Sequence, residues 1–258
     1  MICETDLMWW CSLHKCLSLK DVKSVCDLGV QELHTKQKVV FEQIARSFAQ
    51  LCGEPDVSLD HCQSSPDMWR RLKREIVSLD LVGDDVSVLR FDLNRDQVPT
   101  NLRGHFDLVT NSGTTEHVFN QANCFEVIHD LTSTGGIMAH AVPFAGYENH
   151  GFFKYSMKFF TQIAKYNDYD CLDAWASVDQ NDIQSRPGVA DFFVDHSGMF
   201  RNARSSDQHP IDFYNLKLDE YRSLDACIYV ALRKTHDRTF QFPVDLPDDC
   251  HTSPPSRA

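Results

Sequence analysis

Short runs of apolar residues alternate along the chain with segments in which apolar residues recur every three or four positions. The runs have the length of β-strands, and the recurring positions mark helices with one buried face. Between the first two runs, apolar residues from Leu33 to Leu51 recur at helical spacing until Gly53 and Pro55 end the pattern. This alternation predicts a parallel β-sheet whose strands are joined by packed helices. The predicted strands lie at residues 22–26, 75–79, 86–91, 106–110, 137–142, 170–178 and 227–232.

The same pattern predicts a single domain over residues 1–242. A polar stretch at 179–212, with several prolines and glycines, separates the last two predicted strands, and we interpret it as an insertion over one end of the sheet. The tail at 243–258 holds four prolines and is expected to lie extended on the surface. With 258 residues and 42% hydrophobic content, the chain can build the core of such a domain.

Charge and composition narrow the function classes. The chain has 25 Lys and Arg against 37 Asp and Glu, and the formal charge of −12 disfavours nucleic-acid and anionic membrane partners. No apolar run approaches the length of a membrane span, and the acidic start around Glu4 and Asp6 is unlike a secretion signal. The ten cysteines form no Cys-x-x-Cys pair, which argues against a zinc knuckle. We therefore expect a cytoplasmic protein.

Polar residues follow the first three predicted strands. Asp27 and Gly29 follow the first strand, Asp80 the second and Asp92 the third. The carboxyl ends of parallel strands form the crevice in which open α/β sheets bind ligands. A carboxylate after the second strand can accept both hydroxyls of a ribose, and Asp92 can accept from an adenine amino group. Each position also has a plainer interpretation, Gly29 as a packing turn and the two aspartates as turn or cap residues.

Five strings in the chain resemble the ordered motifs of class I S-adenosylmethionine-dependent methyltransferases. They are Asp27-Leu-Gly-Val-Gln31, Ser78-Leu-Asp80, Leu89-Arg-Phe-Asp-Leu-Asn94, Phe106-Asp-Leu-Val-Thr-Asn-Ser-Gly-Thr-Thr-Glu-His-Val118 and Gly135-Gly-Ile-Met-Ala-His140. The likeness runs roughly from residue 22 to residue 234. Its most specific part, 106–153, resembles bacterial methyltransferases, some of them linked to the modification of glycans or small molecules. The first string departs from the family pattern, which has several glycines where this chain has Val30 and Gln31.

The resemblance implies an α/β fold, a three-layer Rossmann-like seven-stranded sheet of order 3-2-1-4-5-7-6 with strand 7 antiparallel. It implies S-adenosylmethionine as the cofactor and methyl transfer to an oxygen or nitrogen of a small molecule or sugar. It also implies a set of cofactor-binding residues. These are Asp27, Gly29 and Gln31 for the methionine part, Asp80 for the ribose, Asp92 and Leu93 for the adenine, and Asn111 for the wall between cofactor and acceptor.

A hydroxyl or amine acceptor must also lose a proton, which calls for a base near the methyl group. The candidate catalytic residues are His150, in a loop rich in aromatic residues, and His117 and Glu116 after the fourth predicted strand. His150 is either the base or the donor of a structural hydrogen bond. His140 lies inside the fifth predicted strand, and we expect it to be structural.

The Glu116-His117 pair is similar to the end of a Glu-x-x-Glu-His motif with which some related methyltransferases hold a divalent metal. In this chain Gly113 stands at the first Glu position. We therefore expect the pair to cap a helix or to contact substrate, and we predict no metal.

Two further functions remain open. A dinucleotide-binding oxidoreductase would also use a carboxylate after the second strand for the ribose of NAD, but the chain lacks the Gly-x-Gly-x-x-Gly fingerprint. A cofactor-binding but inactive partner subunit is the other alternative, because the first motif has a single glycine. The aromatic loop at 144–155 favours a compact acceptor, a small molecule or a glycan.

Overall fold

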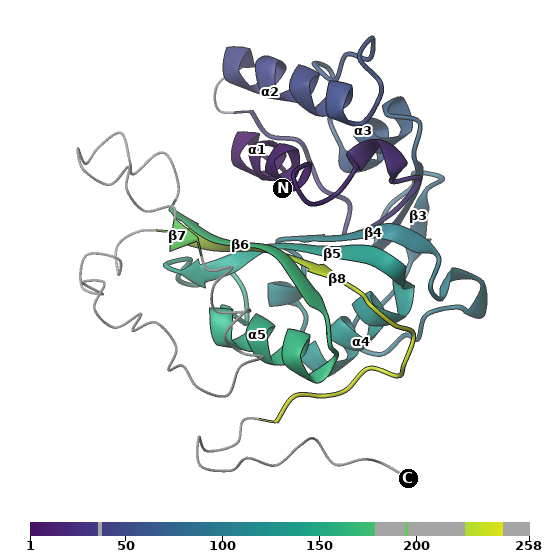
Figure 1. The fold of residues 1–258 in the computed structure, drawn as a ribbon, viewed down its shortest axis with the longest axis vertical. Helices are drawn as coiled ribbons and strands as arrows, with labels where there is room; N and C mark the ends of the chain where they lie inside the picture. The colour runs from purple at the N-terminus through teal and green to yellow at the C-terminus, as the bar shows by residue number, and fades with distance from the viewer. Residues whose placement is uncertain (36–37, 179–193, 196–224, 245–258) are drawn as a thin grey trace.

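A mixed β-sheet runs through the part of the chain that the computed structural model describes, residues 1–35, 38–178, 194–195 and 225–244 (Figure 1). The strands stand side by side in the order β3-β2-β1-β4-β5-β8-β6-β7. In chain order they are β1 (Ser24–Leu28), β2 (Glu75–Asp80), β3 (Val88–Arg90), β4 (Phe106–Ser112), β5 (Thr132–Ala145), β6 (Asp170–Val178), β7 (Val194–Asp195) and β8 (Ala226–Arg233).

The directions of these strands confirm the predicted fold. Strands β3, β2, β1, β4 and β5 pair in parallel, whereas β8 is antiparallel to both β5 and β6. If the two-residue β7 is left out and β8 is counted as the seventh strand, the order is 3-2-1-4-5-7-6, and the seventh strand is antiparallel. Strand β7 pairs with β6 and belongs to the expected insertion at 179–212. The rest of that insertion and the tail from 245 lie outside the described residues, so the domain limits stay a prediction.

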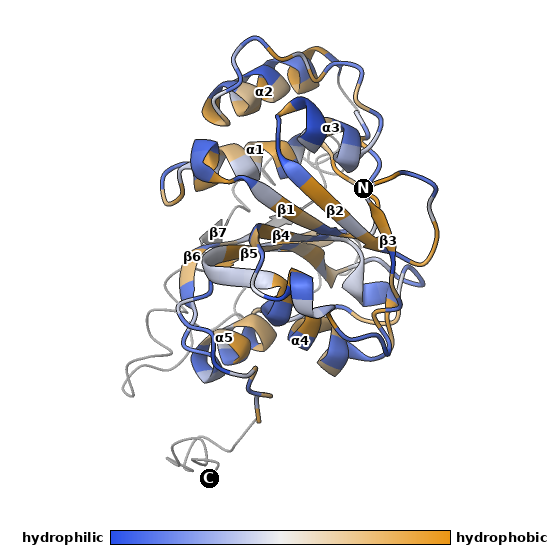
Figure 2. Ribbon diagram, turned by 90° about the vertical axis from the view of Figure 1, so that its right-hand side faces the viewer, coloured by the Kyte–Doolittle hydropathy of each residue, from blue (hydrophilic) through white to orange (hydrophobic). Residues whose placement is uncertain are grey.

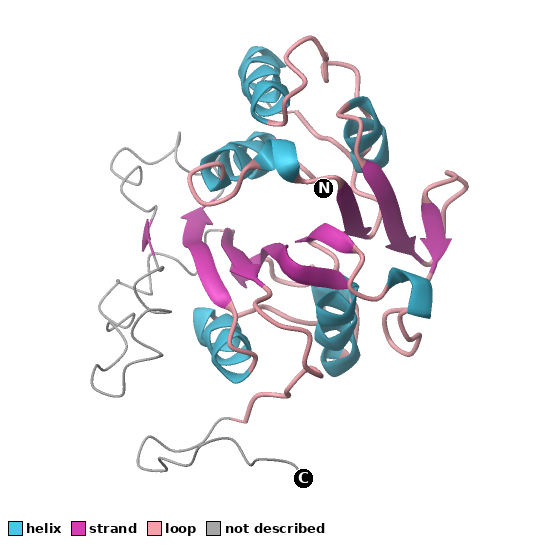
Figure 3. Ribbon diagram, turned by 45° about the vertical axis from the view of Figure 1, so that its right-hand side comes forward, coloured by secondary structure: helices cyan, strands magenta, loops and turns pink. Residues whose placement is uncertain are grey.

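Helices cover both faces of the sheet, which gives the molecule three layers (Figures 1 and 3). Helices α1 (Glu4–Leu13), α2 (Lys38–Leu51) and α3 (Ser65–Arg71) lie on one face, and α4 (Gln121–Leu131) and α5 (Met157–Tyr166) lie on the other. Three short 3-10 turns complete the described elements, η1 (Leu19–Asp21), η2 (Thr100–Leu102) and η3 (Thr115–His117). Among the helices described here, none is both long and apolar enough to cross a membrane.

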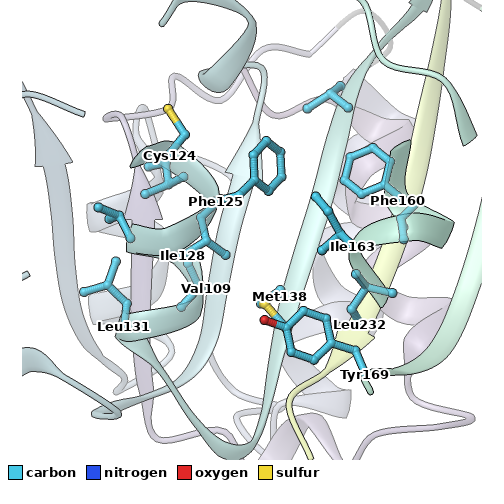
Figure 4. Packing of buried hydrophobic residues seen from close by; sticks show 14 of the residues in the cluster. Val109, Cys124, Phe125, Ile128, Leu131, Met138, Phe160, Ile163, Tyr169 and Leu232 are labelled. Carbon is cyan, nitrogen blue, oxygen red and sulfur yellow. The ribbon is translucent and has the colours of Figure 1, made fainter. Parts of the chain in front are cut away.

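The core consists of two apolar clusters, one on each face of the sheet. Each helix carries both hydrophilic and hydrophobic residues (Figure 2), as expected where one helix face packs on a sheet. Under α4 and α5 the side chains of both helices interdigitate with those of β4, β5 and β8 (Figure 4). On the other face, Trp10, Phe48 and Trp69 join α1, α2 and α3, with ring centroids 5.4–5.8 Å apart.

The pairing register brings the carboxyl ends of four parallel strands to one edge of the sheet. Leu28 of β1 pairs with Leu79 of β2, and Ser112 of β4 pairs with Ala141 of β5. The segments that follow β1, β2, β4 and β5 therefore lie along the same rim. This rim contains most of the residues that the sequence singles out.

Substitution of Phe160 tests the packing between α5 and the sheet. Its side chain is 0% exposed, and its ring centroid lies 4.9 to 6.1 Å from those of Phe125, His140 and Tyr155. Phe160→Ala should lower the free energy of unfolding by about 3–5 kcal/mol, because it leaves a cavity in a close-packed cluster. The matched variant Phe152→Ala, at a ring that is 68% exposed, should change it by less than about 0.5 kcal/mol. Urea unfolding measures both, and equal effects would contradict this packing.

Candidate active site

The turn after β1 is tied to the end of β2. Gly29 adopts a φ of +74°, and its N–H donates to the carbonyl oxygen of Leu79 at 2.8 Å. The next N–H, that of Val30, donates to the Asp80 carboxylate at 2.9 Å. A Cβ on Gly29 would lie 2.9 Å from the Thr114 hydroxyl oxygen. Both the left-handed conformation and this close approach therefore require glycine here.

The carboxylate oxygens of Asp80, at the rim, can each accept a further hydrogen bond. Oδ2 accepts from the Val30 N–H, and Oδ1 accepts from the Val82 N–H at 3.2 Å. The side chain is partly exposed. A carboxylate oxygen has two lone pairs, so each oxygen retains a site for a further donor. The two hydroxyls of a ribose match this pair of acceptors.

Asp27 is the fourth residue of β1, so the structure places it inside the strand, just before the turn. Its side chain is fully buried on the sheet face covered by α3, and the Thr110 hydroxyl donates to Oδ1 at 2.6 Å. Burial raises the pKa of Asp27 to about 6, and the polar groups of Ser65, Thr110 and Trp69 offset part of the rise. The contact of Asp27 with the methionine part of a cofactor therefore stays a prediction.

Gln31 fills the space beside Gly29. The side chain is buried, and its Nε2 donates to the Leu28 carbonyl oxygen at 3.1 Å and to the Thr114 hydroxyl at 3.0 Å. The Thr114 hydroxyl in turn donates to the Leu28 carbonyl oxygen at 2.5 Å. Gln31 thus joins the turn after β1 to the segment after β4.

Asp92 and Leu93 form a turn at the end of β3. Asp92 Oδ1 accepts from the Asn94 N–H at 2.9 Å, and Asp92 Oδ2 lies 3.0 Å from Arg95 Nε. The Asn94 N–H lowers the pKa of Asp92, more than Arg95 does. Leu93 is buried in the core cluster under α4 and α5. This arrangement matches the turn interpretation of Asp92, and it leaves the adenine role as a prediction.

Asn111 holds the η3 turn after β4. Its Nδ2 donates to the Thr115 hydroxyl oxygen at 2.9 Å, and its Oδ1 accepts from the Thr115 N–H at 3.2 Å. The Tyr155 hydroxyl also donates to the Thr115 oxygen, at 2.9 Å. His140 lies 3.3 Å from Asn111 Nδ2, and burial lowers the pKa of His140 to about 3. His140 is therefore a neutral, structural side chain, as expected.

Glu116 is the most unusual side chain of the site. It is 0% exposed, and neither carboxylate oxygen has a hydrogen-bond partner among the described residues. Burial raises the pKa of Glu116 to about 7. A buried carboxylate in this state needs either a proton or a neighbouring positive charge.

The structure brings His117 and His150 to this carboxylate. Their Nε2 atoms lie 3.9 Å and 3.8 Å from Glu116 Oε1, and their ring centroids are 4.8 Å apart. Both imidazoles are 46% exposed. Burial, and next the charge of His150, lower the pKa of His117. The three predicted catalytic residues therefore form one group, which we name the Glu116–His117–His150 cluster.

Main-chain hydrogen bonds hold the His150 loop against Glu116. The N–H groups of Phe152 and Phe153 donate to the Glu116 carbonyl oxygen at 2.8 and 3.2 Å. Before His150, Tyr147 and Asn149 adopt positive φ values of 51° and 62°, which non-glycine residues rarely adopt. Such backbone conformations concentrate at functional sites.

A cavity of about 350 Å³ borders the cluster. Its lining combines the ends of β4 and β5, the start of α1 and β8, and all three members of the cluster. Sequence reasoning missed Asp6, Cys227 and Tyr229, which also line it. Asp6 is buried and accepts from the Cys3 N–H at 2.7 Å, and the Tyr147 hydroxyl lies 3.1 Å from Cys227 Sγ. These residues come from the two ends of the chain, and no local motif joins them.

Several solved structures are similar to this chain over most of its length. A candidate sarcosine dimethylglycine methyltransferase from Galdieria sulphuraria has a TM-score of 0.48 at 11% identity, covering 91% of this chain and 85% of its own. A candidate methyltransferase from Bacillus halodurans has a TM-score of 0.45 at 14% identity, and the match covers 90% of this chain and 100% of its own. The 1,6-didemethyltoxoflavin-N1-methyltransferase from Burkholderia thailandensis was solved with bound S-adenosylhomocysteine. It has a TM-score of 0.42 at 12% identity, and the match covers 89% of this chain and 79% of its own.

No protein-family model and no curated protein matches the chain. The assignment of the fold therefore depends on the strand order and directions of the sheet. These are the order and directions of the class I methyltransferase fold.

The buried Asp27 should make the free energy of unfolding depend on pH. Its pKa is about 6 in the folded protein and 3.8 in the reference state, so its stabilising contribution is full below pH 3.8 and is lost as the pH rises through 6. Relative to Asp27→Asn, the natural protein should lose up to about 3 kcal/mol between about pH 4 and pH 7. Urea unfolding across this range measures the difference.

The exposed Asp60 provides the control for this measurement. Asp60→Asn should leave the pH dependence of the unfolding free energy unchanged. If Asp27→Asn also left it unchanged, the buried position of the Asp27 carboxylate would be wrong.

Proposed function

We propose that the protein transfers a methyl group from S-adenosylmethionine to an oxygen or nitrogen atom of a small molecule or sugar. One observation carries the proposal. The sheet edge that holds the Gly29 turn and the Asp80 carboxylate also holds, two strands along, a cavity bordered by the Glu116–His117–His150 cluster. A donor site and an acceptor site side by side are what a group transfer between two small molecules requires.

The rim fits the nucleoside part of the cofactor. Asp80 retains two acceptor positions for ribose hydroxyls, and Gly29 keeps the backbone beside it free of a side chain. The turn at Asp92 and Leu93 is the proposed adenine end. Gly29 and Gln31 are the proposed contacts at the methionine end. When bound, S-adenosylmethionine supplies a methyl group on a positively charged sulfur.

The protein's task in such a displacement is to align the acceptor and to exclude water. Gly113 lines the cavity, and Asn111 fixes the η3 turn that carries Glu116 and His117. Asn111 is the proposed wall between cofactor and acceptor. The cavity has the volume of a site for a compact ligand. Its enclosure by α1 and the His150 loop favours a small acceptor over a polymer.

The Glu116–His117–His150 cluster is the proposed destination of the acceptor's proton. His150 is half exposed at the cavity, so its imidazole can reach a bound hydroxyl or amine. The Glu116 carboxylate oxygen Oε1 lies 3.8 Å from His150 Nε2. His150 is thus the proposed base, with Glu116 and His117 beside it.

Calorimetric titration with S-adenosylmethionine, S-adenosylhomocysteine and NAD tests the proposal. We expect both sulfur compounds to bind and NAD not to bind. No heat from either sulfur compound at about 500 μM would overturn the proposal, since such weak binding is outside the usual range for a cofactor. Binding of NAD instead would favour an oxidoreductase. If the sulfur compounds bind but the protein transfers no methyl group to any acceptor, the result would favour an inactive subunit.

Asp80→Ala should weaken the binding of S-adenosylhomocysteine by about 1–3 kcal/mol, because it removes both acceptors for the ribose. The matched control is Asp84→Ala, at an exposed aspartate in the same loop, which should leave the affinity unchanged. Calorimetry measures both, and thermal unfolding checks that both variants fold. Equal affinities for the two variants would remove Asp80 from the cofactor site.

A further inference from the structure

We propose that Glu116, His117 and His150 form a binding site for a divalent transition-metal ion at the edge of the cavity. Each of the three residues offers one ligand atom, and these atoms all lie within 4.8 Å of one another. The sequence motif predicts no metal because Gly113 stands where related proteins have a first glutamate. The structure instead supplies a third ligand from the loop after β5, which the motif does not include.

The spacing of the ligand atoms is close to that of a coordination sphere. Ligands about 2.0–2.2 Å from a common ion lie about 3.0–3.5 Å from each other in tetrahedral or octahedral geometry. The observed distances from Glu116 Oε1 to the two Nε2 atoms are 3.8 and 3.9 Å. The three ligand atoms lie within 4.8 Å of one another, so coordination requires the two half-exposed imidazoles to move closer together.

The state of Glu116 is an independent reason to expect a cation. The side chain has no exposed surface, and both oxygens lack a hydrogen-bond partner among the described residues. In the described ranges, the basic groups within 4.0 Å of this carboxylate are the two histidines. An uncompensated buried charge costs several kcal/mol. A metal ion between the three side chains would compensate it.

The surrounding main chain is built to hold Glu116 in this position. A Cβ on Gly151 would lie 2.9 Å from the Glu116 carbonyl oxygen, and a Cβ on Gly113 would lie 3.3 Å from Oε1. Glycine at these two positions lets the His150 loop and the end of β4 approach Glu116 closely. This close approach of the main chain restricts the positions that Glu116 can take.

The donor set identifies the class of metal. Two imidazoles and one carboxylate suit Zn²⁺, Fe²⁺, Co²⁺ or Mn²⁺, whereas Mg²⁺ and Ca²⁺ prefer oxygen ligands. Three protein ligands leave a coordination position open, as in catalytic sites. Because all three residues line the cavity, this position faces the space proposed for the acceptor.

A role for the ion rests on the proposed function, but the site itself does not. A cation at the open position would lower the pKa of an acceptor hydroxyl bound to it. The ion would then promote loss of the proton that otherwise falls to His150 as the base.

Titration of chelator-treated protein with Co²⁺ tests the site. We expect one equivalent to bind with a Kd below about 10 μM and to give visible absorption bands that Zn²⁺ abolishes by competition. His150→Gln and Glu116→Gln should each weaken binding at least about tenfold. Circular dichroism checks the fold of each variant. If Glu116→Gln does not fold, the His150→Gln result decides the test.

The matched control is His105→Gln. His105 Nε2 lies 2.9 Å from Glu75 Oε1, so this control removes a histidine from a glutamate pair on the surface. Co²⁺ binding should be unchanged. No Co²⁺ binding at about 1 mM, or equal binding by His150→Gln and the natural protein, would overturn the proposal. The titration with S-adenosylhomocysteine does not involve these side chains, so failure of the metal site and failure of the proposed function can be told apart.

Discussion

A carboxylate that is buried without a hydrogen-bond partner is the physical constraint on which this site depends. Glu116 is held in that state by the η3 turn, which Asn111 and Tyr155 fix through Thr115. Removing such a group from water is favourable only if a proton or a cation compensates it. The two histidines beside it, the cavity in front of it and the glycines that permit close approach all follow from this requirement.

The fourth strand connects the two halves of the site. On one side of its end, Thr114 bonds Gln31 and the Leu28 carbonyl oxygen, and so belongs to the turn after β1. On the other side, Glu116 faces the cavity. Thr114 and Glu116 are two residues apart in the chain, so the proposed cofactor turn and the cluster are held by the same short segment. Gln31 gives this connection a side-chain hydrogen bond to Thr114.

The sequence predicts the layers of the fold well and the directions of side chains less well. Strand-length apolar runs identified seven strands, and the motif resemblance supplied their order. Helix α1 was missed, because its buried residues, such as Trp9, Trp10 and Leu13, do not follow a single helical face. The burial of Asp27 was also missed, since polar residues at strand ends do not reveal which face of the sheet they occupy. The position of β7 inside the expected insertion was not predicted.

For the site, the candidate residues could be found in the sequence, but their convergence could not. Glu116 and His117 are neighbours in the chain, whereas His150 comes from a loop after the next strand. Their meeting depends on the hydrogen bonds from Phe152 and Phe153 to the Glu116 carbonyl oxygen, which no local pattern encodes. Asp6 and Tyr229 of the cavity wall are joined to the cluster only by the fold.

The most direct test of the account is a crystal structure of the protein with S-adenosylhomocysteine. We expect the ribose hydroxyls to lie within hydrogen-bond distance of the Asp80 carboxylate and the sulfur to face the cavity beside Gly113. An ordered ligand bound elsewhere, or a rim without ligand density at saturating concentration, would contradict it.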